Sequence, residues 1–319
     1  MASHPIIVDI DPGMGVPYAD IDDNLAVLFA LGSNELDLKL ISIVAGNVPA
    51  HVGVQSIDRT LGFVQGDVPV SIGSRSPLFR PYSAGCDVIA ARVPGIEYNG
   101  AFEPASDVSG RGFALCDMAA TLEAAPGPVT IVAVGPLTNI ALLLHQRPDL
   151  HEKIDSVVIM GGAITVPGNI TPFAEFNIWI DPDAAEMVFR SPVPKVLVGL
   201  DVTTTVGLSA ADFDPTFDAL ANRRFSEYAK PAIEGWIEVI RHLAGSERFN
   251  PHDPIALAWL VDPTLFEAVQ MDVSVDVRTG KTSGRPDAAG TTAVCLAVDA
   301  DRFKTLFFER LGRVALREA

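Results

Sequence analysis

Five apolar runs constrain the fold of this chain more than any other feature of its sequence. They lie at residues 6–8, 38–45, 129–134, 154–160 and 196–200, and each stops directly before Gly or Asp. Segments with helical spacing of apolar residues lie between them. Largely apolar strands that alternate with helices are typical of a parallel sheet covered on both faces. We therefore expect one doubly wound, mostly parallel α/β sheet with helices on both faces.

The C-terminal part adds a smaller feature to this pattern. Residues 271–277 and 291–298 look like paired strands joined across a loop with Gly and Pro, which predicts a small antiparallel extension near the C-terminus. Residues 74–112 are irregular, and loops of this length are usually functional or mobile. No internal repeat or linker divides the chain, so we expect a single domain over residues 1–319. The other expected elements are a strand at 68–72 and helices at 50–63, 113–124, 137–146, 181–189, 221–243, 254–260 and from about 301.

Composition excludes several classes of partner. The chain has 23 Lys and Arg against 40 Asp and Glu, a net charge of −17, and no basic cluster, which argues against nucleic acid or an anionic membrane as a partner. No apolar run reaches the roughly 20 residues of a membrane span, and the N-terminus lacks a signal-peptide pattern, so we expect a cytoplasmic protein. The three cysteines, Cys86, Cys116 and Cys295, are widely spaced and are expected to be reduced, buried thiols.

Carboxylates gather where the first strand ends and the first helix begins. Asp9 and Asp11 follow the apolar run, a Pro-Gly turn comes next, and Asp20, Asp22 and Asp23 precede a helical pattern that continues to about residue 31. Helix capping accounts for one of these acids, because the exposed amides and the helix dipole favour a carboxylate there. Several converging carboxylates repel one another unless a cation lies among them, and oxygen ligands favour calcium or magnesium. A metal site is therefore the first hypothesis.

Topology predicts which other residues share this site. Ligands of such sheets bind outside the carboxyl ends of the strands. Asp11, Asn47, Gly135, the pair at 161–162 and Asp201 all fall at such ends.

One loop adds hydrogen-bonding side chains to that edge. Asn169, Glu175 and Asn177 lie within a short stretch, and together they suggest a ligand with several hydroxyl groups.

Together these features resemble the nucleoside hydrolase family, the calcium-dependent N-ribohydrolases. The blocks that carry the resemblance are Asp9-Ile10-Asp11-Pro12-Gly13 with Asp22-Asp23, Ala45-Gly46-Asn47, Gly135-Pro136-Leu137-Thr138-Asn139, Met160-Gly161-Gly162, Gly168-Asn169 with Ala174-Glu175-Phe176-Asn177 and Asp181-Pro182, and His252-Asp253-Pro254. They occur in the family's order with near-family spacing. The resemblance implies hydrolysis of the N-glycosidic bond of ribonucleosides to free base and ribose, in nucleoside catabolism.

The resemblance also implies roles for individual residues. Asp11, Asp23 and Asp253, with the backbone carbonyl of Val134, would be the Ca²⁺ ligands. Asp11 would also be the general base for the activated water, and His252 would assist departure of the base. The implied substrate contacts are Asp22, Asn47, Met160, Asn169, Glu175, Phe176 and Asn177, and a late-helix aromatic residue, Tyr228, is added as a candidate base contact. Phe225 and Trp236 on the same helix are expected to pack in the core rather than to contact the base.

Two departures from the family pattern bear on the substrate. Residues 15–21 lengthen the loop before the paired acids, so the metal geometry requires this insertion to bulge outward, and Asp20 becomes a rival ligand. The family's His-Gly pair before the helix near residue 113 is replaced by Ser109-Gly110. His252 favours the inosine-uridine or pyrimidine-preferring branch over the purine-preferring one.

Two other functions compete with this hypothesis. A catalytically silent nucleoside- or ribose-binding protein would keep the site but lose turnover. A haloacid-dehalogenase-like, Mg²⁺-dependent phosphohydrolase also begins with Asp-x-Asp after the first strand, but it needs a lysine at a later strand end, where this chain has none. The resemblance further implies a homodimer or homotetramer.

Overall fold

The computed structural model describes residues 3–93, 108, 110–220 and 222–317. Within them, ten strands form one sheet in the order β4-β3-β2-β1-β5-β6-β7-β10-β8-β9. The strands are β1 (His4–Ile10), β2 (Leu36–Ile43), β3 (Val70–Ile72), β4 (Gly112–Phe113), β5 (Val129–Ala133), β6 (Ile154–Met160), β7 (Lys195–Val198), β8 (Phe266–Asp276), β9 (Lys281–Pro286) and β10 (Thr292–Val298). Residues 94–107 and 109 of the expected irregular segment, and residue 221 at the expected start of a helix, lie outside the described residues.

The pairing confirms a mostly parallel sheet with an antiparallel extension. All neighbouring strands from β4 to β10 pair in parallel, whereas β8 is antiparallel to both β10 and β9. The expected pairing of the last two strands is present, but the loop between them contains β9 as a further strand. The sequence of β9, KTSGRP, lacks apolar alternation because β9 is an edge strand with mostly exposed side chains.

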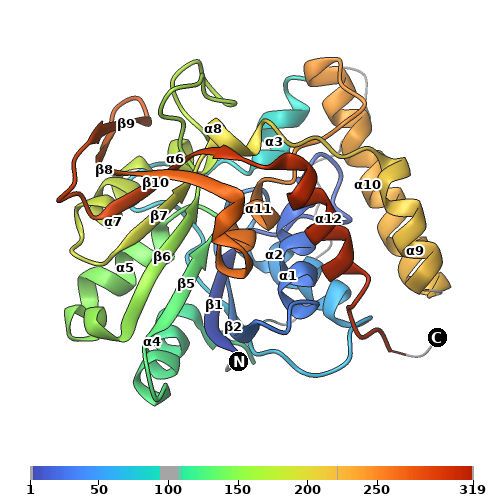
Figure 1. Ribbon diagram of the computed structural model, residues 1–319, viewed down its shortest axis with the longest axis horizontal. Helices are drawn as coiled ribbons and strands as arrows, with labels where there is room; N and C mark the ends of the chain where they lie inside the picture. The colour runs from blue at the N-terminus through green and yellow to red at the C-terminus, as the bar shows by residue number, and fades with distance from the viewer. Residues whose placement is uncertain (1–2, 94–107, 109, 221, 318–319) are drawn as a thin grey trace.

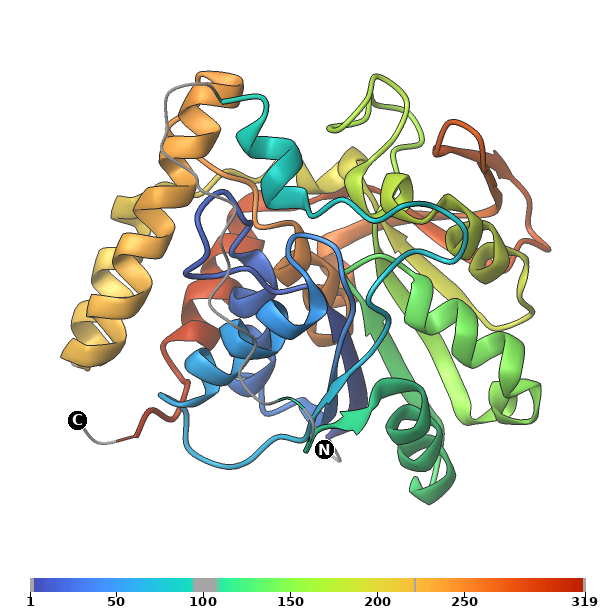
Figure 2. The same ribbon diagram turned by 180° about the vertical axis from the view of Figure 1, so that it is seen from behind.

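Helices cover both faces of the sheet (Figures 1 and 2). They are α1 (Asp22–Leu31), α2 (Ala50–Leu61), α3 (Gly85–Ala90), α4 (Ala114–Ala124), α5 (Thr138–Gln146), α6 (Phe176–Ile180), α7 (Pro182–Arg190), α8 (Leu200–Thr203), α9 (Asp214–Leu220), α10 (Arg223–Ala244), α11 (His252–Val261) and α12 (Ala300–Leu311), with short 3₁₀ turns at Pro148–Lys153, Ala210–Phe213 and Pro263–Leu265. The helices α3, α6, α8 and α9 were not expected, because four to seven residues are too few for a helical period to be recognised.

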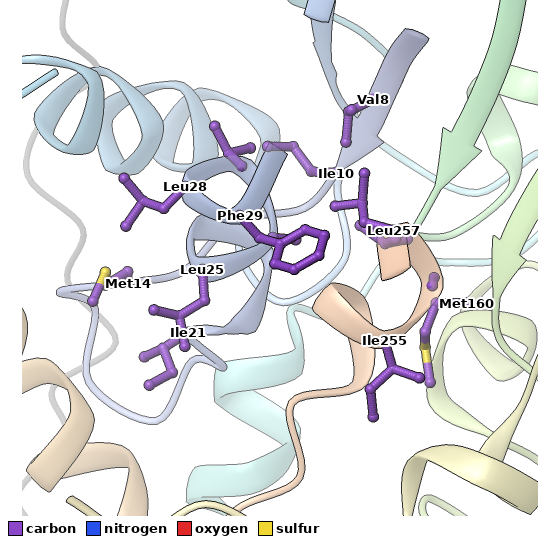
Figure 3. Close-up of a cluster of buried hydrophobic side chains, with 14 of the residues drawn as sticks. Val8, Ile10, Met14, Ile21, Leu25, Leu28, Phe29, Met160, Ile255 and Leu257 are labelled. Atoms are coloured by element: carbon purple, nitrogen blue, oxygen red, sulfur yellow. The ribbon is translucent and has the colours of Figure 1, made fainter. Parts of the chain in front are cut away.

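Alternation along β1 divides the core in two. Ile6, Val8 and Ile10 face a cluster formed with α1, α2, α11 and α12, whereas Ile7 faces a second cluster formed with α4, α5 and α7. Figure 3 shows part of the first cluster, where Phe29 of α1 and Leu257 of α11 lie with Ile10. Each such buried side chain contributes roughly 2 kcal/mol. This packing holds the first turns of α1 and α11 beside the end of β1.

The inserted loop differs from the expectation that it bulges outward. Gly15 and Pro17 are exposed, but Met14 and Tyr18 are buried beneath them. The backbone N–H of Met14 donates to Asn24 Oδ1, 3.2 Å away, and Tyr18 has a left-handed backbone with φ of 64°. The loop therefore folds back onto α1, and the paired acids of α1 keep their place at the end of β1.

Two further sequence expectations were tested. Cys86 and Cys295 are buried as expected, but the expectation was wrong for Cys116, which is exposed on α4. It lies on the solvent side of a helix whose apolar period is carried by Ala114, Met118 and Leu122. In the described ranges, no helix has the length and apolar character needed to cross a membrane.

Candidate active site

A buried acidic cluster lies where α1 and α11 begin. One carboxylate oxygen each of Asp22, Asp23 and Asp253 lies within 4.8 Å of the others. Asp22 and Asp23 occupy the first turn of α1, and Asp253 occupies the first turn of α11. The backbone N–H of Asp253 donates to Asp22 Oδ2, 3.3 Å away, which joins the two helix ends. Helix N-termini favour carboxylates, and two such ends meet here.

Asp11 joins this cluster through hydrogen bonds. Its backbone N–H donates to Asp23 Oδ1 at 2.9 Å, and its Oδ2 accepts the backbone N–H of Asn47 at 2.6 Å. The side chain of Asn47 also donates to Asp23 Oδ2 at 3.2 Å. A Cβ atom at Gly46 would lie 2.0 Å from Asp11 Oδ2, and one at Gly135 would lie 2.8 Å from Oδ1. Both glycines are therefore required by the close approach of the backbone to this carboxylate.

Burial and mutual repulsion perturb these acids strongly. Burial raises the pKa of Asp11 and Asp253 well above the ordinary value, and neighbouring carboxylates raise it further. Burial and Asp22 raise the pKa of Asp23 to about 8 and also raise that of Asp20. Among the described residues, none of these acids forms an ion pair with Lys, Arg or His. Buried carboxylates without a cationic side chain are the donor set that a divalent cation such as Ca²⁺ or Mg²⁺ prefers.

The Val134 carbonyl is held by Asn177, and both residues line the same cavity as Asp11. Asn177 Nδ2 donates to Val134 O at 2.6 Å and to Met160 O at 3.2 Å. Glu175 caps α6: its Oε1 accepts the backbone N–H of Asn177, and its Oε2 accepts those of Ile178 and Gly162. Burial raises the pKa of Glu175, although these backbone donors oppose the rise.

A cavity of about 350 Å³ connects these groups. The expected site residues that line it are Asp11, Asp22, Asn47, Val134, Met160, Asn169, Glu175, Phe176, Asn177, His252 and Asp253. Asp23 lies directly behind them, bonded to Asp11 and Asn47. Asp11 and Asn47 thus meet at the carboxyl edge of the sheet, as the topology predicted, together with Asp253, which the resemblance implied. Asp201, expected at the same edge, does not line the cavity, because its carboxylate accepts the backbone N–H groups of Ile164 and Thr165.

Tyr228 is the one expected site residue that the structure does not bring to the cavity. Its hydroxyl lies 3.0 Å from Thr60 Oγ1, and its ring stacks on Phe63 with centroids 5.2 Å apart. It also lies against the inserted loop, 3.7 Å from the position of a Cβ at Gly15. Trp236, two turns further along α10, lines the cavity instead.

His252 lines the cavity as the first residue of α11, directly before Asp253. Its Nδ1 is 2.7 Å from the hydroxyl of Thr203. Burial lowers the pKa of His252, and Asp22 partly opposes this. With the Thr203 hydroxyl as donor to Nδ1, the neutral imidazole carries its proton on Nε2.

Several lining residues were not expected from the motifs. They are Ile89, Arg92, Ile170, Thr204, Ile240, Leu243, Ala244 and Asn250. Asp20, a rival metal ligand in the sequence analysis, and Trp236, expected in the core, also line the cavity. The apolar spacing of Trp236, Ile240 and Leu243 was a signal for one helix face, but helical spacing alone does not tell a core face from a cavity face.

Comparison with known proteins gives a consistent result. Residues 6–305 match the family model described as inosine-uridine preferring nucleoside hydrolase. The chain is 38% identical over 323 residues to the pyrimidine-specific ribonucleoside hydrolase RihA of Salmonella gallinarum, covering 96% of this chain and 98% of RihA. Identity to RihA of Citrobacter koseri is 37% over 326 residues, with 97% and 98% covered.

Solved structures of nucleoside hydrolases share the fold of this chain. The purine-preferring ribonucleoside hydrolase from Gardnerella vaginalis superimposes with a TM-score of 0.84 at 30% identity, covering 97% of this chain and 98% of that one. The plant nucleoside hydrolase PpNRh1 superimposes with a TM-score of 0.79 at 27% identity, covering 97% and 99%.

Proposed function

The chain belongs to the inosine-uridine preferring nucleoside hydrolase family and is a ribonucleoside hydrolase. We propose that it cleaves the N-glycosidic bond with Asp11 as general base and Ca²⁺ as cofactor. The observation that carries the proposal is the convergence of eleven expected site residues on one cavity beside a buried acidic cluster. Membership in this family also excludes the phosphohydrolase alternative.

The residues that would hold Ca²⁺ are Asp11, Asp23 and Asp253, with the carbonyl oxygen of Val134. They support this choice because they offer buried carboxylate and carbonyl oxygens, the ligands of a hard cation that accepts many of them. Asp22 lies in the same acidic cluster and is proposed to contact the ribose. When bound, Ca²⁺ supplies Lewis-acid chemistry that lowers the pKa of a water molecule.

Asp11 is suited to accept a proton. The Asn47 N–H bond fixes the orientation of its carboxylate. A positioned general base typically accelerates a reaction 10² to 10⁴-fold.

The remaining polar groups are suited to a ribosyl cation. Cleavage of a glycosidic bond passes through an oxocarbenium-like state, which nearby oxygens stabilise. Because Asn177 Nδ2 is bonded to two backbone carbonyls, its Oδ1 is the atom left to accept a ribose hydroxyl. Asp22 adds a carboxylate at the same end of the cavity.

His252 is proposed to assist the leaving base. Thr203 holds Nδ1, which leaves Nε2 for a nitrogen of the base. Because its lowered pKa keeps the imidazole neutral at pH 7, His252 acts as a hydrogen-bond donor from Nε2 in this proposal. The relatives do not indicate which nucleobase this chain prefers, because RihA is named pyrimidine-specific and the Gardnerella vaginalis enzyme is named purine-preferring.

Ribose release from inosine, uridine and cytidine at saturating Ca²⁺ tests the proposal. We expect turnover by the wild type and a loss of about 10³-fold in kcat for Asp11→Asn. Asp218→Asn, at an exposed acid on α9, is the control and should keep wild-type kcat. Near wild-type kcat in Asp11→Asn would show that Asp11 is not the base. Tight binding of nucleosides without ribose release would favour the silent binding protein.

A single domain over residues 1–319, a homodimer or homotetramer and a cytoplasmic location remain part of the proposal. They rest on the sequence pattern and on the family resemblance.

A further inference from the structure

The cavity lining has an acidic and an apolar part. The acidic part, Asp11, Asp22 and Asp253, lies just after β1 and in the first turns of α1 and α11. The apolar part includes Ile89 of α3, Ile170, and Trp236, Ile240 and Leu243 of α10. In both ribbon views, α3 lies beside the C-terminal end of α10, above the carboxyl edge of the sheet (Figures 1 and 2).

The apolar wall on α10 follows one helix face from the core to the mouth of the cavity. Trp236, Ile240 and Leu243 are spaced four and three residues apart, which places them on the same face. Trp236 is 6% exposed, Ile240 is half-buried and Leu243 is 40% exposed. A face that only packed in the core would end in polar residues at this point, whereas this one stays apolar along the cavity.

Polar side chains of the lining direct donors to the backbone. Asn250 Nδ2 donates to Val206 O at 2.6 Å and to Thr204 O at 3.3 Å, and the Thr204 hydroxyl donates to Leu200 O at 2.6 Å. Arg92 Nη2 donates to Ile170 O at 2.8 Å. These bonds hold the lining in place and commit the donors of Asn250 and Thr204 to the backbone.

We propose that the leaving base is recognised by apolar contact with the Trp236–Ile240–Leu243 face, so that the enzyme prefers ribonucleosides whose base carries an apolar substituent. The inference rests on the proposed function, in which the ribose occupies the acidic part. An aromatic base packs on Trp236, and an alkyl group on the base extends toward Ile240 and Leu243. Each newly buried methylene group raises binding about fourfold.

Matched pairs of nucleosides test this preference. The wild type should hydrolyse 5-methyluridine with a kcat/KM about fourfold above that of uridine, and N6-propyladenosine at least tenfold above adenosine, chiefly through KM. If none of the four releases ribose, both the proposed function and this inference are overturned. If the unsubstituted member is preferred in both pairs, the inference is overturned and the proposed function stands.

Variants then locate the preference on α10. Ile240→Gln places an amide on the apolar wall at a half-buried position and should remove the preference for the alkylated member of each pair. Trp236→Ala should lower kcat/KM for all four nucleosides by about tenfold or more, and Trp236→Phe should restore most of the loss. Val239→Ala truncates a buried residue of the same helix outside the cavity lining, and should leave the ratios unchanged. Wild-type ratios in Ile240→Gln overturn the inference.

Discussion

At the scale of single residues, neutral donors rather than cations hold the acids of the site. Asn47 supplies its backbone N–H to Asp11 and its side-chain amide to Asp23. Such dipoles orient carboxylates but leave their net negative charge in place. That charge is what a site needs to bind a divalent cation and to stabilise a ribosyl cation, so the absence of a paired Lys or Arg within the described residues agrees with the proposed chemistry.

Lys195 is a buried residue at the start of β7 and does not line the candidate active site. Its Nζ donates to Val193 O at 2.6 Å and Ser191 O at 2.8 Å, and burial lowers its pKa from 10.5 to about 8. Between these values the unfolded chain binds more protons than the folded one, so the free energy of unfolding rises with pH. Relative to Lys195→Met, the wild type should gain on the order of 2 kcal/mol between pH 8 and 10.5.

Urea unfolding at a series of pH values measures this gain. Below pH 7.5 the difference between wild type and Lys195→Met should be constant, because Lys195 is charged in both states. Lys281→Met, at an exposed lysine on β9, is the matched control and should give a flat difference throughout. Parallel profiles for Lys195→Met and the wild type would show that Lys195 keeps an ordinary pKa.

At the scale of elements, Asn139 at the start of α5 ties β1 and β2 to the loop that follows β3. Its Nδ2 donates to Asp9 Oδ1 at 2.8 Å and to Ile43 O at 3.3 Å, and its Oδ1 accepts the N–H of Ser74 at 2.8 Å. Replacing Asn139 with Ala removes all three bonds and leaves the Ser74 N–H without a partner, whereas Asp9 Oδ1 keeps the Ser42 hydroxyl and Ile43 O keeps the Gly73 N–H. We expect Asn139→Ala to lower the free energy of unfolding by about 3 kcal/mol.

Chemical denaturation with Gln146→Ala as control checks this value. Gln146 is exposed at the other end of α5, and its substitution should change stability by less than about 0.5 kcal/mol. A loss below about 1 kcal/mol for Asn139→Ala would mean that water replaces the three hydrogen bonds.

Elements also show how far the sequence determines the fold and the site. The parallel strands and long helices were predictable because an apolar strand flanked by Gly or Asp has few alternatives. The short helix α3 and the edge strand β9 were not, because neither has an apolar period. In the site, motif residues such as Asn47 were placed correctly by the strand ends. Ile89 and Ile170 were missed because they reach the cavity only through tertiary packing.

At the scale of the whole molecule, the fold concentrates helix N-termini at one edge of the sheet. Parallel strands joined by right-handed crossovers place the start of each following helix at the carboxyl edge. The first turns of α1 and α11 carry the acidic cluster there, and Glu175 caps α6 beside the Val134 carbonyl. Strands, helices and acids from distant parts of the chain thus converge on the proposed cation site, so binding there should stabilise the entire fold.

Thermal unfolding with and without metal tests that coupling. A ligand that binds only the folded chain adds about 2.7 kcal/mol at one hundred times its Kd, so saturating Ca²⁺ should raise the Tm by several degrees and excess chelator should reverse the rise. Asp23→Asn and Asp253→Asn should each abolish the shift, because each removes a carboxylate of the cluster that would hold the cation. The Asp218→Asn control should retain it. A Tm rise with Mg²⁺ but not with Ca²⁺ would identify a different ion at the same site. No Tm rise with either ion would mean that protons, rather than a cation, stabilise the buried acids, which the raised pKa values of Asp23 and Asp253 permit.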